Sequence, residues 1–120
     1  MWSDWSEHWG RDAAATLLAR HPDVDGIVCG SDQIARGVLD TARDLSRGVP
    51  DDLAVIGYDN WSALAENSRP ELTSIDANLQ QLGRRAAQSL FEAIDGDAAV
   101  PGTHHLPVRL VIRGSTIARR

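Results

Sequence analysis

The sequence predicts an α/β fold, a parallel sheet flanked by helices, on three observations. Two short apolar runs, Gly26–Cys29 and Leu53–Ile56, have the length and β-branched content of strands buried on both faces. The segment between these runs carries apolar residues at helical spacing. Polar residues follow each run, and in an open α/β sheet the carboxyl ends of the strands mark the edge where ligands bind.

The first helix is expected over Ser6 to Arg20, with Ser6 as its cap. Glu7 lies favourably at the positive end of the helix, and the Ala13–Ala15 run has high helix propensity. Pro22 cannot continue a helix, so the chain should turn there. The apolar stripe at helical spacing consists of Trp9, Ala13, Leu17 and Leu18.

The segment from Gly26 to Tyr58 is typical of a right-handed βαβ crossover with parallel strands. Ser31 or Asp32 should cap its helix, which is expected to end near Ser46, before Gly48 and Pro50. The residues expected to face inward are Ile34, Ala35, Val38, Leu39 and Ala42.

After Asn60 the pattern predicts a short helix over 61–67 and a brief extended segment over 72–75. A long helix should follow from Asn78, as its cap, to Ile94. The last strand is expected over Leu106–Ile112, and Pro107 favours an edge position. The long helix has few partners in this chain, so it should pack against another copy or swing out; its apolar face consists of Leu79, Leu82, Ala86, Leu90 and Ile94.

Composition limits the class of protein. The 120 residues fit one domain or a piece of a larger one, and an apolar content of 42% is enough for a core. The 12 Lys+Arg against 17 Asp+Glu give a net charge of −5, which argues against this segment binding nucleic acid by itself. The single cysteine, Cys29, has no disulfide partner, and neither a signal peptide nor a membrane span is evident. We therefore expect a cytoplasmic protein with no membrane partner.

Three residues could hold a small polar ligand. Ser31 and Asp59 follow parallel strands, so both should lie on the same rim of the sheet. A sugar or polyol needs carboxylate and hydroxyl partners and an aromatic face, which Trp5 could supply. Alternatively, Ser31 and Asp59 only cap the helices that follow them, and Trp5 packs in the core or an interface. Trp2 and Trp9 are expected to pack rather than bind.

The sequence contains no recognisable catalytic or metal-binding motif. His104 and His105 are adjacent, and no Cys or carboxylate cluster accompanies them, which predicts no metal site. The residues Cys29–Gln33 lack the second glycine of a nucleophile elbow, and no phosphate or dinucleotide motif occurs. The sequence therefore predicts a protein with no catalytic residues and no cofactor.

Six stretches, in order and with similar spacing, resemble the C-terminal part of the effector-binding core of LacI/GalR-family transcriptional regulators. They are Trp5–Gly10 (WSEHWG), Ile27–Gly37 (IVCGSDQIARG), Val49–Asn60 (VPDDLAVIGYDN), Pro70–Ile75 (PELTSI), Leu82-Gly83 and Leu106–Thr116 (LPVRLVIRGST). The resemblance implies a periplasmic-binding-protein-like core, here an incomplete, Rossmann-like C-terminal subdomain, with an effector such as a sugar or nucleobase bound between two subdomains. Asp59 matches the family's effector-contacting carboxylate, Ser31 a polar residue and Trp5 an aromatic near the ligand. Asp32 matches an aspartate expected mainly to cap.

The resemblance also implies how the chain divides. Residues 1–70 should form part of the C-terminal subdomain, residues 71–104 a crossover segment and helix of the N-terminal subdomain, and residues 105–120 a strand and tail that return. The chain would then be the effector-sensing, homodimerising part of a repressor that binds operator DNA through an N-terminal headpiece absent from these 120 residues. A transport-type periplasmic sugar-binding protein and an enzyme on the same scaffold are the alternatives.

Overall fold

A single four-stranded sheet organises the molecule in the computed structural model, which describes residues 4–96 and 101–117. Trp2 lies outside the described residues. The strands are β1 (Gly26–Val28), β2 (Ala54–Tyr58), β3 (Thr73–Asp76) and β4 (Arg109–Val111), in that order across the sheet. β1, β2 and β3 are parallel, and β4 is antiparallel to β3 at the edge. The predicted parallel unit and the edge position of the last strand are confirmed.

Within the described residues, four helices accompany the sheet: α1 (Glu7–Arg20), α2 (Asp32–Asp44), α3 (Ser62–Ala65) and α4 (Leu79–Ile94). Serine caps begin the first two, as the sequence predicted. The Ser6 Oγ accepts a hydrogen bond from the Trp9 N–H at 3.0 Å, and the Ser31 Oγ accepts one from the Ile34 N–H at 3.2 Å. Of the two candidates for the cap of α2, the structure therefore selects Ser31 over Asp32.

The core lies between α1, α2 and the strands β1 and β2. All five residues of α2 that were expected to face inward are buried, because they form one continuous face of the helix. Leu53, Val55, Ala65 and Leu72 complete the cluster with no exposed surface. The buried apolar side chains are therefore concentrated around the inward face of α2, where the helix meets the sheet.

α1 packs on α2 through glycines at the crossing. A Cβ atom added at Gly37 would lie 2.2 Å from the Glu7 carbonyl oxygen, and one added at Gly10 would lie 2.4 Å from the Ile34 carbonyl oxygen. The buried residues of α1 are accordingly Gly10, Ala14 and Leu18. Of the predicted stripe, Leu18 is buried and Trp9 packs against the core as expected, whereas Leu17 is exposed. Small side chains allow the closest helix approach, and Trp9, Ala13 and Leu17 border an open pocket.

Ser115 joins the tail after β4 to the centre of the sheet. Its hydroxyl donates to the Val55 carbonyl oxygen at 2.6 Å and accepts from the Thr73 N–H at 2.8 Å. Its own carbonyl oxygen accepts from the Val55 N–H at 3.0 Å. One serine therefore bridges β2 and β3 at the point where the two strands begin to pair.

β4 is shorter than the predicted Leu106–Ile112, and Pro107, which lacks an N–H, stays outside it.

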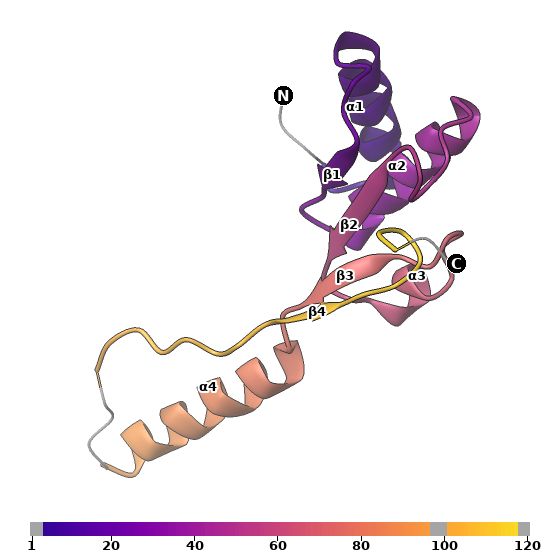
Figure 1. The fold of residues 1–120 in the computed structure, drawn as a ribbon. Coiled ribbons are helices and arrows are strands. Elements are labelled where there is room, and N and C mark those ends of the chain that lie inside the picture. The colour runs from indigo at the N-terminus through magenta and orange to yellow at the C-terminus, as the bar shows by residue number, and fades with distance from the viewer. Residues whose placement is uncertain (1–3, 97–100, 118–120) are drawn as a thin grey trace.

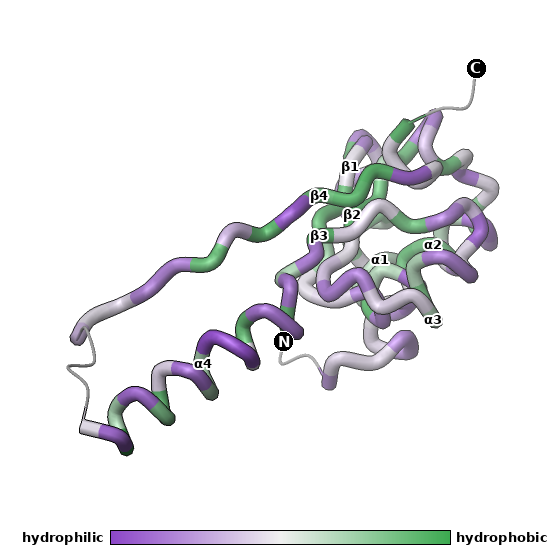
Figure 2. Tube along the Cα trace, turned by 90° about the horizontal axis from the view of Figure 1, so that it is seen from below, coloured by the Kyte–Doolittle hydropathy of each residue, from purple (hydrophilic) through white to green (hydrophobic). Residues whose placement is uncertain are grey.

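α4 projects from the body of the molecule, with the extended chain after residue 101 running beside it (Figure 1). The radius of gyration is 18.1 Å, against about 14 Å expected for a compact 120-residue domain. No residue of α4 is buried, although hydrophobic positions recur along it (Figure 2). As predicted, the helix does not fold back on its own sheet; packing against another copy stays a prediction. Asn78 begins the helix without a side-chain capping bond, in a left-handed conformation at φ 51°, so its predicted capping role was wrong.

Candidate functional site

The parallel strands deliver polar residues to one rim of the sheet. Ser31 comes shortly after β1, Asp59 directly after β2, and Asp76 ends β3. Because Tyr58 pairs with Ile75, Asp59 and Asp76 follow neighbouring positions of adjacent strands. Two carboxylates therefore lie at the rim where the sequence predicted one.

The turn after β2 holds Asp59 in an unusual conformation. Asp59 and Asn60 have φ values of 103° and 51°, a region that side-chain-bearing residues rarely adopt. The Asn60 N–H donates to the Ser74 hydroxyl at 3.0 Å, and the Asn60 Oδ1 accepts from Arg113 Nη2 at 2.8 Å. The side chain of Asp59 is left exposed at the rim. Asp59 does not cap α3, since that helix begins at Trp61 without a side-chain capping bond.

An open cavity of about 680 Å³ borders this turn. It offers two carboxylates at the strand ends, an amide and an aromatic ring, which are the groups that a neutral polyol requires. Its lining residues are Asp59, Asn60, Trp61, Ser62, Glu66, Asp76 and Leu79. Sequence reasoning missed Asp76 and Trp61. The position of Asp76 at the end of the third parallel strand was the pattern that could have found it.

The two carboxylates of the cavity are in different electrostatic surroundings. The Asn78 N–H, 2.8 Å from Asp76 Oδ1, and the Arg109 Nη2, 3.0 Å from Asp76 Oδ2, lower the pKa of Asp76. Partial burial, and then the negative charge of Asp32, raise the pKa of Asp59. Asp76 is therefore already engaged by protein donors, whereas Asp59 is the carboxylate whose charge gains most from a donor on a ligand.

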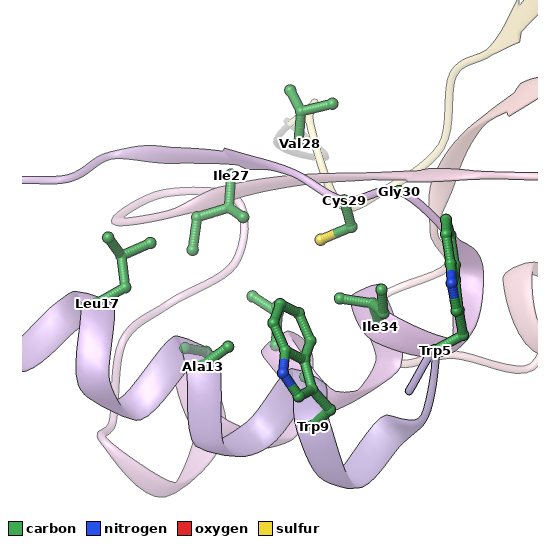
Figure 3. A pocket seen from close by; sticks show the side chains of 12 residues that line it. Trp5, Trp9, Ala13, Leu17, Ile27, Val28, Cys29, Gly30 and Ile34 are labelled. Atoms are coloured by element: carbon green, nitrogen blue, oxygen red, sulfur yellow. The ribbon is translucent and has the colours of Figure 1, made fainter. Parts of the chain in front are cut away.

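Ser31 and Trp5 lie away from this cavity. Ser31 is only 4% exposed, and its hydroxyl is the cap of α2. The Trp5 ring packs against Gly30, where an added Cβ would lie 3.3 Å from the ring. It lines a second pocket, of about 350 Å³, which is apolar and lies between α1 and β1. Figure 3 shows Trp5, Trp9 and Ile34 around this pocket, with the Cys29 sulfur directed into it.

Asp32 is buried, 1% exposed, and does not cap its own helix. Its Oδ2 accepts from the Trp61 N–H at 2.8 Å, and its Oδ1 accepts from the Ser74 hydroxyl at 2.6 Å. The expectation that Asp32 mainly caps was wrong, because Ser31 fills the capping position and Asp32 points to the sheet. Its carboxylate joins α2 to the turn after β2 and to β3.

Cys29 should react slowly with thiol reagents in the folded protein. Burial first, and then the Asp32 carboxylate, raise the pKa of the thiol to about 12. Since only the thiolate attacks, alkylation by iodoacetamide at pH 8 should be slower by roughly a thousandfold than for an ordinary cysteine of pKa ~8.5. The rate in guanidinium chloride, where the chain is unfolded, is the control. A folded-state rate within a factor of ten of that control would contradict this assignment.

The described residues provide neither a metal site nor a membrane-spanning helix. Across residues 4–96 and 101–117, no group of three or more His, Cys, Asp or Glu side chains is placed to hold a metal ion. His104 and His105 are both exposed. Among the helices of the described residues, none has the length and apolar character needed to cross a membrane.

Comparison with known proteins identifies the fold. A family model described as "Periplasmic binding protein-like domain" matches residues 2–116. The regulator CelR of Thermobifida fusca is 35% identical over 114 residues, which are 95% of this chain and 33% of CelR. The chain thus spans about a third of the length of the curated relatives it matches.

Solved structures of similar fold are also transcriptional regulators. A LacI family transcriptional regulator from Arthrobacter sp. FB24, in complex with lactose, superposes with a TM-score of 0.82 at 38% identity, over 93% of this chain and 42% of that one. A lac repressor dimer bound to operator and the anti-inducer ONPF superposes with a TM-score of 0.89 at 29% identity, over 97% and 40%. The resemblance noted from the sequence is confirmed: the chain belongs to the periplasmic binding protein-like domain family, in the form found in LacI-family transcriptional regulators.

Proposed function

We propose that this chain provides one wall of a sugar-effector site in a LacI-family transcriptional repressor. The observation that carries the proposal is the cavity at the strand ends, where Asp59 and Asp76 lie beside the exposed indole of Trp61. Carboxylates accept hydrogen bonds from sugar hydroxyls, and an aromatic ring packs against the apolar face of a pyranose. A relative of similar fold binds lactose, which supports a sugar as the ligand class.

Asp59 is the residue we expect to hold the effector. Its side chain is exposed at the cavity, and partial burial and the negative charge of Asp32 raise its pKa, which supports a role as an acceptor for ligand donors. Hydroxyl donors of a ligand would stabilise that charge. Ser31 and Trp5 would act from the same rim only if the effector extended from the cavity over Gly30.

The rest of the proposal concerns the whole protein. Residues 1–70 and 105–120 would belong to the C-terminal subdomain, and residues 71–104 to the N-terminal subdomain; the projection of α4, with no buried residue, supports this division. The repressor would act in the cytoplasm as a homodimer, bind operator DNA through an N-terminal headpiece, and carry out no enzymatic reaction. The relatives are transcriptional regulators, one of them a dimer bound to operator.

A sugar titration tests this function. The ¹⁵N-labelled 120-residue chain is titrated with lactose, cellobiose, maltose and ribose, and amide shifts are followed. At least one sugar should shift the signals of Asp59, Asn60 and Trp61. Asp59→Asn should weaken that binding by about 10- to 100-fold, the loss expected for a hydrogen bond to a charged group.

Asp44→Asn is the matched control for that titration. Asp44 is exposed at the end of α2, so its neutralisation removes one negative charge far from the cavity and should leave the affinity unchanged. Equal affinity of Asp59→Asn and the parent would remove Asp59 from the site. Shifts confined to the pocket around Trp5 and Trp9 would place the ligand elsewhere and contradict the proposal.

A further inference from the structure

We propose that Asp32 is the positioning residue of the site: its buried carboxylate fixes the turn 59–61 and so directs Asp59 into the cavity. The inference rests on the proposed function for what Asp59 binds. The geometry of the turn and the role of Asp32 in it stand independently of any ligand.

Both oxygens of Asp32 are used on this turn. Oδ2 accepts directly from the Trp61 N–H at 2.8 Å. Oδ1 accepts from the Ser74 hydroxyl at 2.6 Å, and that same hydroxyl oxygen accepts from the Asn60 N–H at 3.0 Å. One carboxylate therefore holds the two residues that follow Asp59, the first through Ser74 and the second directly.

These two amides have no competing partner in secondary structure. Trp61 is the residue before the first turn of α3, so its N–H is outside the helical ladder. Asn60 follows β2 by two residues, and its N–H points to β3 through the side chain of Ser74. Without Asp32, the amide of Trp61 would lose its protein acceptor, and Ser74 would lose the partner that orients its hydroxyl.

The turn needs such an anchor because its backbone is strained. Asp59 and Asn60 are consecutive residues with side chains at φ 103° and 51°. Conformations of this kind persist only where the surroundings determine them. Arg113 holds the Asn60 side chain at 2.8 Å, and the Asp59 N–H donates to the Ile75 carbonyl oxygen of β3 at 2.9 Å. The amides of the two residues that follow Asp59 are held by Ser74 and Asp32.

The absence of a side chain at Gly57 in β2 leaves room for the Asp32 carboxylate against the sheet. A Cβ atom added at Gly57 in β2 would lie 2.2 Å from Asp32 Oδ1 and 2.8 Å from Leu72 Cδ2. A glycine in the middle of a central strand weakens that strand, so its presence is explained by the close approach of Asp32. The positive end of α2, where Asp32 is the first residue, stabilises the buried charge.

Asp32 variants test this role by readouts that need no sugar. Asp32→Asn removes the charge and keeps an acceptor, whereas Asp32→Ala removes both. Ser74→Ala removes the hydroxyl that links Asp32 Oδ1 to the Asn60 N–H and leaves the bond from the Trp61 N–H to Asp32 Oδ2 in place. The pKa of Asp59 is measured from the carboxyl ¹³C shift, and amide exchange is measured at Asn60 and Trp61. Asp44→Asn again serves as the charge-matched control on the same helix.

The variants should separate charge from hydrogen bonding. Asp32→Asn should lower the pKa of Asp59 toward its ordinary value, since the neighbouring negative charge is gone. Asp32→Ala should speed amide exchange at Asn60 and Trp61 by tenfold or more. Ser74→Ala should do so at Asn60 and leave the raised pKa of Asp59 in place. Asp44→Asn should match the parent in both readouts.

Two results would overturn the proposal. The first is a folded Asp32→Ala protein in which the Asn60 and Trp61 amides exchange as slowly as in the parent. The second is rapid exchange of the Trp61 amide in the parent protein, which tests the Asp32 hydrogen bond without any variant and stays decisive if Asp32→Ala does not fold. Failure of Asp59→Asn to weaken sugar binding would instead contradict the proposed function and leave the role of Asp32 standing.

Discussion

Gly37→Ala should destabilise this protein more than any other single methyl addition in α2. The new Cβ would lie 2.2 Å from the Glu7 carbonyl oxygen and 2.7 Å from the Arg11 nitrogen. Both are backbone atoms of α1, so no side-chain rotation can relieve the contact and the two helices must separate. The overpacking should cost about 3 kcal/mol or more, well above the ~1 kcal/mol that alanine gains over glycine in helix propensity.

Urea unfolding followed by circular dichroism measures this loss as a lower midpoint at an unchanged slope. Gly83→Ala is the matched control, because Gly83 also lies within a helix, α4, and an added Cβ there would meet nothing within 4 Å. That variant should be as stable as the parent or up to about 1 kcal/mol more stable. If Gly37→Ala and Gly83→Ala unfolded at the same urea concentration, the close crossing of α1 and α2 would be wrong.

Ser115→Ala should produce the second large loss, although it removes a single oxygen atom. Ser115 has no exposed surface, and its hydroxyl serves the Val55 carbonyl oxygen at 2.6 Å and the Thr73 N–H at 2.8 Å. The substitution leaves a buried acceptor and a buried donor without this partner. Each unsatisfied group costs about 1–3 kcal/mol, so the free energy of unfolding should fall by roughly 2–4 kcal/mol.

The same urea experiment measures this loss, with Ser89→Ala as its control. Ser89 is half-buried on α4, a helix with no buried residue, and removal of its hydroxyl should change the free energy of unfolding by less than about 0.5 kcal/mol. Ser115→Thr keeps the hydroxyl and adds a methyl group, so it reports whether the site tolerates any extra volume. A Ser115→Ala protein as stable as the Ser89→Ala protein would show that the tail does not bridge β2 and β3.

Much of the fold could be predicted because its causes are local. The serine caps of α1 and α2, the inward face of α2 and the strands β1 and β2 each depend on residues within one segment. Cap chemistry and periodicity act over three or four residues, and a sequence displays them directly. The parallel order of β1 and β2 follows from the helix between them.

The candidate site was only partly predictable. Asp59 was found because it directly follows a buried strand, and the structure places it at an open cavity. Asp76 was not predicted as a site residue, because its place beside Asp59 depends on the pairing of β2 with β3. Asp32 was misjudged for a related reason: its partners, Trp61 and Ser74, lie 29 and 42 residues away in the sequence.

The sequence by itself determined which segments are helices and strands, the parallel βαβ core and the family of the chain. Only the tertiary structure decided which stripe of α1 is buried, what Asp32 holds and where Ser115 joins the sheet. The physical reason is the distance along the chain over which each effect acts. Propensity, capping and amphipathic period act within a segment, whereas the closest helix approach and the pairing of buried polar groups depend on segments that only the folded chain brings together.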